Sequence, residues 1–267
     1  MIPQIIHYCW FGNNPLPEKY VKYIEHWKQV MPDYTIKYWS EKDIDIQSIP
    51  FLRDAYKAGK LAFVADYVRL QILYREGGVY MDTDVEVYKS FDSYLNYSFF
   101  TSYEFHPQYR EYRIQRQMTD ETGKRIVEDK MLKIPGSGLM SAIMGAEKGS
   151  AYIKEMIQLY DSISYEELRR RNYTIPTTLA LVAERYGFRY TNEEQHLRDN
   201  IVIFKSNIFA DYRTCDKSSV AVHRCADSWG SKSTFTSIKQ YLYKKKWIRA
   251  IYMRIRNLFE KYPVVYF

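Results

Sequence analysis

The stretch GGVYMDTDVEV, residues 77–87, joins a Gly-Gly turn to a strand-like run with two aspartates one residue apart. Side chains alternate between the two faces of a strand, so an extended run places Tyr80, Asp82 and Asp84 on one face. Adjacent carboxylates repel each other, and aspartate is depleted from strands. A solvated strand end explains most isolated D-x-D pairs, whereas a divalent cation bound by hard oxygen ligands explains a functional pair.

The chain before the two aspartates alternates between strand-like and helical patterns. In order, these predict a buried strand, a helix, a second strand and two helices separated at Gly59, over residues 2–11, 18–30, 34–39 and 50–76. This β-α-β-α-β order favours an α/β fold with a mostly parallel sheet. Ligands of such sheets bind beyond the carboxyl ends of the strands, and the DTD tripeptide follows such an end.

The second half of the chain has a less regular pattern. Residues 104–133 are polar and predict no clear element. Helices are predicted at 151–160 and from Ile175 to a stop at Gly187, and residues 200–210 are strand-like. With no internal repeat or linker, we expect one domain over residues 1–237 and a C-terminal extension over 238–267.

Composition excludes several classes of protein. Of 267 residues, 46% are apolar and 27% charged, which is typical of a soluble globular chain. The N-terminus lacks a basic leader, and no run of 18 apolar residues occurs, so neither a signal peptide nor a membrane-spanning helix is predicted. Three cysteines without C-x-x-C spacing favour reduced thiols and a cytoplasmic location.

The positive charge is concentrated in the C-terminal extension. The chain carries a net charge of +7, and the segment from Lys239 onward holds eight of its 39 basic residues and one of its 32 acidic ones. Apolar side chains recur there at helical spacing, namely at Leu242, Trp247, Ile251, Ile255 and Leu258. This pattern favours a basic amphipathic helix on an anionic membrane, at the inner face of the cell membrane. A core-packing helix is the alternative, and a neutral body argues against nucleic acid binding.

Further polar and aromatic residues are candidates for the same site. Asp66 and Arg69 share a helix face, either as a surface ion pair or as the border of a ligand crevice. Trp10 ends the first strand, where it either stacks on a base or lies in the core. His223, in AVHRCADSWGS, is a candidate third metal ligand, and an imidazole beside carboxylates suits Mn²⁺ better than Mg²⁺. Nucleophile-elbow, Walker A, dinucleotide-binding and H-E-x-x-H motifs are absent from the sequence.

Three stretches together resemble a known family: IPQIIHYCWFG, LAFVADYVRLQILYREGGVYMDTDVEV and AVHRCADSW. They are similar to bacterial glycosyltransferases with a sugar-binding D-x-D motif, in the family of the yeast initiating α-1,6-mannosyltransferase. The glucosyltransferase domains of clostridial toxins are more distantly similar. The resemblance covers most of residues 1–90 and a patch near 220–230. It implies a GT-A type, Rossmann-like fold and transfer of a sugar with retention of anomeric configuration.

The resemblance also implies roles for single residues on the donor side. Trp10 matches a tryptophan that stacks on the nucleotide base, and Tyr80 matches a tyrosine that lines the nucleotide pocket. Asp66 matches an aspartate that binds the ribose or donor sugar. Arg69 matches an arginine at the donor sugar and phosphates.

The remaining matches concern the metal and the leaving group. Asp82 matches the first D-x-D carboxylate, near the ribose and donor sugar, whose metal contact often runs through water, and Asp84 the direct metal ligand. His223 lies where related enzymes place a metal-bound histidine. Ser228 and Trp229 match a mobile loop that closes over the diphosphate. Catalysis is therefore assigned to Asp82, Asp84, Arg69 and Trp229 with Mn²⁺, or Mg²⁺ in its place.

The predicted function is a metal-dependent retaining hexosyltransferase. Its donor is expected to be UDP-galactose or UDP-glucose, with GDP-mannose as the alternative, and its acceptor a growing surface polysaccharide, as in capsule or lipopolysaccharide synthesis, or a lipid-linked oligosaccharide. No enzymic nucleophile stands out, which favours front-face substitution. Two other classes stay open: a noncatalytic sugar-nucleotide or membrane-binding module, and an adaptor that acts through its basic tail.

Overall fold

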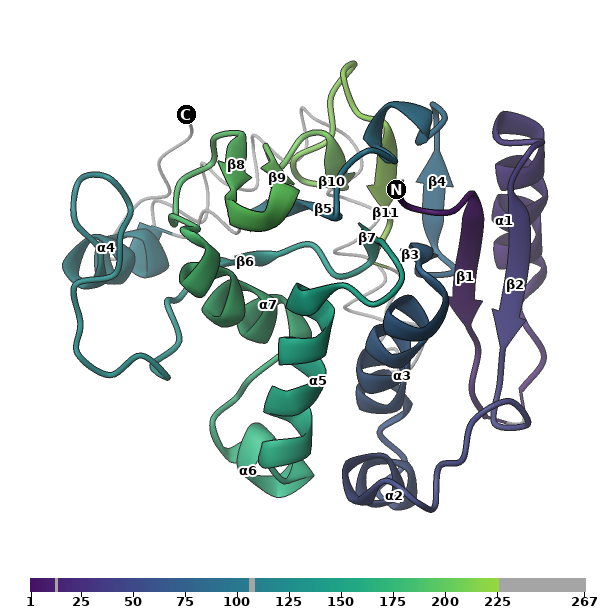
Figure 1. Ribbon diagram of the computed structural model, residues 1–267, viewed down its shortest axis with the longest axis horizontal. Helices are drawn as coiled ribbons and strands as arrows, with labels where there is room; N and C mark the ends of the chain where they lie inside the picture. The colour runs from purple at the N-terminus through teal and green to yellow at the C-terminus, as the bar shows by residue number, and fades with distance from the viewer. Residues whose placement is uncertain (13, 106–108, 226–267) are drawn as a thin grey trace, which may run out of the picture.

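The computed structural model describes residues 1–12, 14–105 and 109–225 (Figure 1). An eight-stranded sheet forms its centre, with the strand order β2-β1-β3-β7-β5-β9-β8 and with β6 paired to β5. The first three of these strands are β2 (Thr35–Trp39), β1 (Ile5–Cys9) and β3 (Gly78–Met81). The others are β7 (Ile143–Ala146), β5 (Phe99–Phe105), β9 (Ile201–Phe204), β8 (Gln195–Leu197) and β6 (Ser137–Leu139).

Most strands of this sheet run in one direction. β1 pairs in parallel with both β2 and β3, and β5 pairs in parallel with β9. The antiparallel pairs are β3 with β7, β7 with β5, β8 with β9 and β6 with β5, so β7, β8 and β6 run against the other five strands. The predicted mixed and mostly parallel α/β sheet is thereby confirmed.

Each face of the sheet carries its own apolar core. One face is covered by α2 (Pro50–Lys57), α3 (Leu61–Glu76), α5 (Ala151–Ser162), α6 (Tyr165–Arg170) and α7 (Ile175–Ala183). The other face packs on α1 (Glu18–Val30) and on a three-stranded sheet of β10 (Phe209–Asp211), β11 (Ala221–His223) and β4 (Val85–Val87). Because side chains of β3 alternate, Tyr80 enters the first core while Val79 and Met81 enter the second.

Local sequence signals explain where the helices stop. Gly77, with a φ of 70°, ends α3, and an added Cβ there would meet the Lys148 backbone nitrogen at 2.7 Å. The predicted helices at 18–30, 50–76 and 175–187 are confirmed, including the break near Gly59 and the stop at Gly187 after the 3₁₀ turn η2 (Glu184–Tyr186). The helix predicted at 151–160 is α5, which extends two residues further.

One strand prediction was wrong, and another was confirmed as two separate strands. The run through Asp82 and Asp84 is not one extended strand, because β3 ends at Met81 and β4 begins at Val85 in the other sheet. The strand-like residues 200–210 likewise divide into β9 and β10, one in each sheet. A propensity pattern reports an extended conformation, but only tertiary pairing decides that a run must bend and change sheets.

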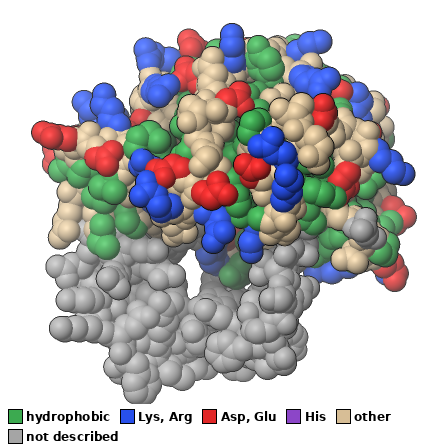
Figure 2. All heavy atoms as spheres, turned by 90° about the horizontal axis from the view of Figure 1, so that it is seen from below, with side chains coloured by type: hydrophobic (Ala, Val, Ile, Leu, Met, Phe, Trp, Pro, Cys, Tyr) green, Lys and Arg blue, Asp and Glu red, His purple; other side chains and the backbone are tan. Residues whose placement is uncertain are grey.

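The described part of the polar stretch 104–133 includes the helix α4 (Tyr109–Met118) and ends in a loop that returns to β6. Two further 3₁₀ turns are η1 (Asp92–Tyr94) and η3 (Arg198–Asn200). Among the described residues, no helix combines the length and hydropathy needed to span a membrane. Figure 2 views the molecule from below relative to Figure 1, and basic and acidic side chains are interspersed over the described part of this face. The predicted extension at 238–267 and its domain boundary lie outside the described residues.

Candidate metal centre

A tight turn after β3 brings two carboxylates to the junction of the two sheets. The Asp82 nitrogen donates to the Ala142 carbonyl at 2.9 Å, and the Val85 nitrogen donates back to the Asp82 carbonyl at 3.1 Å. Asp82 and Asp84 therefore project from a turn and not from one strand face. The bend replaces the strand alternation predicted for these side chains, and it directs both carboxylates toward a third residue.

That third residue is His223, the last residue of β11. β11 pairs antiparallel with β4 and places His223 opposite Val85, directly beside the turn. Its Nε2 lies 3.2 Å from Asp84 Oδ1 and 3.9 Å from Asp82 Oδ2. One ligand atom from each of the three residues lies within 4.8 Å of the others. The predicted metal set Asp82, Asp84 and His223 is thus brought together by the fold.

The donor set suits a divalent cation. Asp84 is 5% exposed, so its charge is largely removed from water. Burial lowers the pKa of His223, but the adjacent Asp84 carboxylate outweighs it and holds that pKa well above 6.5. A cation placed among these atoms would take over the compensating role of that proton. Two carboxylates and one imidazole nitrogen form a mixed oxygen and nitrogen set, which fits Mn²⁺.

Arg69 and Asp66 border this cluster from α3. Arg69 Nη2 lies 3.1 Å from Asp66 Oδ1 and 3.4 Å from Asp82 Oδ1. Its Nη1 donates to the Ser141 carbonyl at 2.8 Å and its Nε to the Ala65 carbonyl at 3.2 Å. Asp66 and Arg69 are 9% and 4% exposed, so the surface ion pair considered from the sequence was wrong, and their predicted place at the border of a ligand crevice stays a prediction.

The balance of charge around Arg69 is negative. Burial raises the pKa of Asp66 to about 7, against the lowering effect of Arg69 and with a further rise from Asp82. One guanidinium therefore faces two carboxylates, while a third, Asp84, pairs with His223. We call the five residues Asp66, Arg69, Asp82, Asp84 and His223 the acidic corner. Asp66 and Asp84 are buried and Asp82 is partly buried. Charged groups that perturb one another's pKa values in this way cluster at functional sites.

Tyr80 supports the corner from behind. Its hydroxyl donates to Asp82 Oδ1 at 3.1 Å, and the Arg69 guanidinium lies over its ring, 4.5 Å from the centroid. Tyr80 is 1% exposed, so it fixes the positions of Asp82 and Arg69. Its predicted role in lining a nucleotide pocket stays a prediction.

The other predicted donor residues are Trp10, which is buried, and two residues outside the described part of the chain. Trp10 is 7% exposed, packs against Tyr20 and donates from Nε1 to the Asn14 carbonyl at 2.8 Å. The structure thus shows the core alternative, and base stacking by Trp10 stays a prediction. Ser228 and Trp229 lie outside the described residues.

Sequence reasoning missed three supports of the corner. The Arg224 nitrogen donates to the Asp84 carbonyl at 3.0 Å, and its Nε donates to Glu86 Oε2 at 2.8 Å, which ties β11 to β4. The Ser141 carbonyl, in the loop between β6 and β7, accepts from Arg69. Glu86 lies two residues after Asp84 and Arg224 directly follows His223, and this proximity was the signal for both. Nothing in the sequence pointed to a backbone carbonyl at Ser141.

Comparison with known proteins agrees with this site. Residues 17–101 match the family model described as a glycosyltransferase sugar-binding region containing the DXD motif. That region includes Asp66, Arg69, Asp82 and Asp84. The resemblance predicted from the sequence is confirmed for this segment: residues 17–101 are similar to the sugar-binding region of D-x-D glycosyltransferases.

Two relatives share part of their length with the chain. Inositol phosphoceramide mannosyltransferase 3 of Schizosaccharomyces pombe is 33% identical over 100 residues, which are 36% of this chain and 28% of that protein. The initiation-specific alpha-1,6-mannosyltransferase of Candida albicans is 32% identical over 89 residues, 31% and 23% of the two chains. The match thus spans less than a third of either relative. A solved structure named PaToxG glycosyltransferase superposes with a TM-score of 0.49 at 15% identity, over 69% of each chain.

Proposed function

We propose that this chain is a metal-dependent retaining glycosyltransferase that moves a hexose from a nucleotide sugar to a glycan or lipid-linked acceptor. The observation that carries the proposal is the acidic corner. Its residues are up to 157 positions apart along the chain, and the fold brings them together at one strand end. Its position matches the rule that ligands of open α/β sheets bind beyond the carboxyl ends of strands. The sugar-binding family region covers four of its five residues.

The chain's own residues have clear tasks in such a transfer. A divalent cation bound by Asp82, Asp84 and His223 would supply Lewis acid stabilisation of the leaving diphosphate. Arg69 holds Asp66 and Asp82 in fixed positions, since its nitrogens contact both carboxylates and two backbone carbonyls. The Tyr80 hydroxyl donates to the same Asp82 oxygen that Arg69 contacts. Pre-organised charges of this kind stabilise a transition state without reorganising during the reaction.

The identity of the donor is open between two classes. UDP-galactose and UDP-glucose were expected from the sequence, with GDP-mannose as the alternative. The two relatives reported above are named as mannosyltransferases, which supports testing GDP-mannose with equal weight. Retention of configuration by front-face substitution is part of the proposal and rests on the family resemblance.

Attachment to the inner face of the cell membrane belongs to the proposal as well. Its support is the sequence of residues 238–267, with seven more basic than acidic side chains and apolar residues at helical spacing. A membrane-bound enzyme would meet a lipid-linked acceptor directly. The cytoplasmic side is supported by the odd number and the spacing of the three cysteines, Cys9, Cys215 and Cys225, which favour reduced thiols.

The decisive experiment measures nucleoside diphosphate release from a panel of UDP- and GDP-sugars, with and without Mn²⁺. We expect slow release from one donor that requires the metal. If no donor is turned over, Mn²⁺-dependent binding of UDP or GDP distinguishes an enzyme that needs its acceptor from a noncatalytic binding module. Absence of both turnover and Mn²⁺-dependent nucleotide binding would overturn the proposal and favour an adaptor acting through its tail.

A further inference from the structure

A hollow in the described part of the molecule lies apart from the acidic corner. A cavity of about 600 Å³ opens between α5, the end of α7 with η2, residues 187–189, and the loop 124–131. No residue of the corner lines it, and neither do β3, β4, β11 or α3. Its volume lies within the range of pockets that bind small organic molecules.

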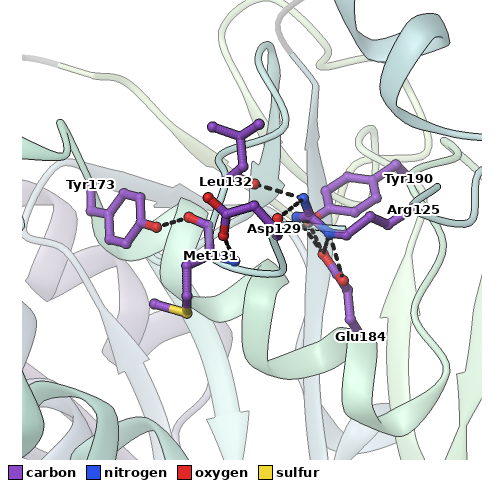
Figure 3. Close-up of polar contacts among 7 residues, drawn as sticks. All are labelled: Arg125, Asp129, Met131, Leu132, Tyr173, Glu184 and Tyr190. Carbon is purple, nitrogen blue, oxygen red and sulfur yellow. Dashed lines mark hydrogen bonds and ion pairs between the residues drawn. The ribbon is translucent and has the colours of Figure 1, made fainter. Parts of the chain in front are cut away.

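The outer wall of this pocket is fixed in place. Arg125 donates from Nε and Nη2 to the Glu184 carboxylate, at 2.9 and 2.8 Å, and from Nη1 to the Leu132 carbonyl at 2.7 Å. Tyr173 donates its hydroxyl to the Met131 carbonyl (Figure 3). The Tyr190 nitrogen donates to the Gly123 carbonyl at 2.8 Å. We call residues 123–132, bound in this way, the Arg125 wall. A pre-formed wall loses little conformational entropy when a ligand binds.

The floor of the pocket is apolar. Leu181, Val182 and Phe188 are at most 8% exposed and belong to the core beneath the helices. Val127, Met131 and Leu159 are partly buried and pack against the same core. These side chains leave apolar surface facing the hollow, and an apolar group of a ligand would remove that surface from water.

The rim is cationic. Five lining residues are basic and two are acidic, and the two acids are paired: Glu184 with Arg125, and Glu155 with Arg185 at 2.9 Å. Arg189 donates from Nη1 to the Thr122 hydroxyl at 3.0 Å. Within the described part of the chain, no carboxylate lies within ion-pair distance of Lys124 or Lys130, which are both exposed at the pocket mouth. A fixed apolar floor below uncompensated lysines favours an anion with an apolar body.

We propose that this pocket binds a small amphiphilic phosphate ester, with its phosphate at Lys124 and Lys130 and its apolar part on the floor formed by Leu159, Leu181 and Phe188. Lysine is a common point-charge ligand for phosphate. The site is separate from the acidic corner, so the proposal stands whether or not the chain proves to be a glycosyltransferase.

The test is calorimetric titration of the full chain with octyl phosphate below its micelle concentration. Octyltrimethylammonium supplies the same apolar body with the opposite charge, and inorganic phosphate supplies the anion alone. We expect saturable binding of octyl phosphate and at least about tenfold weaker binding of the other two probes, equivalent to about 1.4 kcal/mol. Equal binding of octyl phosphate and inorganic phosphate, or of octyl phosphate and octyltrimethylammonium, would overturn the proposed ligand class.

Two sets of variants locate the binding. Lys124→Gln with Lys130→Gln should weaken octyl phosphate binding about tenfold. The charge-matched control is Lys28→Gln with Lys57→Gln, at exposed lysines on α1 and at the end of α2, and it should not change the binding. Gln158→Trp places a bulky ring at the exposed α5 edge of the pocket and should abolish binding with the melting temperature retained. Equal affinity in all these variants would remove the pocket as the site.

The source of the phosphate is distinguished by competition. Vesicles of phosphatidylcholine with phosphatidic acid should displace octyl phosphate if the natural ligand is a bilayer lipid, and should leave it bound if the ligand is a soluble ester. Nucleoside diphosphate release with Mn²⁺, measured on the same variants, should be unchanged when octyl phosphate binding is lost. Loss of the two properties together in Gln158→Trp would contradict the separation of the two sites.

Discussion

The acidic corner and the Arg125 wall are each organised around a buried arginine, yet they differ in how the charges balance. The side chains of Arg69 and Arg125 are both 5% exposed. Arg125 faces one carboxylate, Glu184, which also accepts from the Tyr190 hydroxyl at 2.5 Å. Arg69 faces Asp66 and Asp82, with Asp84 nearby at His223.

This difference separates a structural ion pair from a ligand site. A buried ion pair in which every hydrogen-bond donor has an acceptor holds two segments together, and its charges are already compensated. The corner has more carboxylates than cations, so the fold tolerates repulsion that a purely structural network would avoid. We infer that a bound cation relieves that repulsion, and the predictions below test the contrast between the two regions.

The largest expected effect follows from removing a metal ligand. Asp84→Asn keeps the shape of the side chain and removes its charge, so Mn²⁺-dependent nucleoside diphosphate release should fall about a thousandfold, because several kcal/mol of transition-state stabilisation are lost. The melting temperature without metal should not fall, because His223 can lose its proton once the Asp84 charge that raises its pKa is removed. Steady-state rates and thermal scans of both proteins supply the measurement.

Glu86→Gln is the matched control for this variant. Glu86 lies two residues further along the same segment, but its carboxylate pairs with Arg224 and contributes no atom to the Asp82, Asp84 and His223 set. It should retain Mn²⁺-dependent release within a few fold of the wild type. Equal loss in both variants would show that any charge change near the turn disrupts the site, and the assignment of Asp84 would fail.

The Arg125 wall should respond in stability and not in activity. Glu184→Gln leaves the buried Arg125 guanidinium without its counter-charge, which should lower the free energy of unfolding by about 2–3 kcal/mol. Release of nucleoside diphosphate per folded molecule should stay within a few fold of the wild type. Urea unfolding and steady-state rates check the two halves of this expectation.

A double variant provides the control for the wall. Arg125→Met with Glu184→Gln removes the uncompensated charge, so it should recover part of the stability lost in the single variant. If the single and double variants unfold at the same urea concentration, Arg125 and Glu184 do not act as a coupled pair. A loss of activity as large as that of Asp84→Asn would abolish the contrast between the two regions.

Local signals in the sequence predicted one of these regions and missed the other. The D-x-D pair and His223 stood beside strand-like runs, and the family resemblance connected them across the chain. The helices at 18–30, 50–76 and 175–187 followed from apolar periodicity, proline and glycine. These features are determined by residues that are close together in the sequence.

What the sequence did not predict depends on contacts between distant segments. The spacing of Asp66 and Arg69 fits an exposed pair and a buried pair equally well, and only packing of α3 against the sheet decides between them. The bend at Asp82–Asp84 arises because β4 pairs with β11. These segments are far apart in the sequence: Glu86 and Arg224, which contact each other, are separated by 138 residues. Arg125 and Glu184 are 59 residues apart with no shared motif, so the wall and its pocket left no local signal.

Adding metal should have a smaller effect, on stability, that again distinguishes the acidic corner from the Arg125 wall. If Mn²⁺ binds the folded corner alone, the free energy of unfolding should rise by about 2.7 kcal/mol at a concentration 100 times its dissociation constant. Glu184→Gln should show the same increment, and Asp84→Asn should show little or none. A thermal scan with and without Mn²⁺ measures the increment. An equal increment in Asp84→Asn would mean that the metal binds somewhere other than this corner.

The smallest expected effect concerns a histidine that lies outside both regions. His7 on β1 is fully buried, with its Nε2 hydrogen-bonded to the Gly77 carbonyl at 2.8 Å and its Nδ1 accepting from Trp39 Nε1 at 3.1 Å. Burial lowers its pKa below 6.5, in spite of the opposing hydrogen bond to Gly77. The folded protein therefore holds a neutral imidazole, whereas the unfolded chain takes up a proton near pH 6.5.

The sign of the pH effect follows from this difference. Below pH 6.5 the unfolded state binds more protons than the folded state, so stability should fall as the pH decreases toward the lowered pKa, by at most about 1.4 kcal/mol per pH unit. His7→Gln keeps a hydrogen-bond donor without a titrating group, and it should show a shallower decrease between pH 7.5 and 5. Because the other histidines are unchanged, subtracting the two urea-unfolding profiles isolates His7. Parallel profiles would mean that His7 takes up its proton in the folded state as well. The fold would then hold a buried cation beside Gly77. That result would contradict the contrast between compensated and uncompensated charges from which these predictions start.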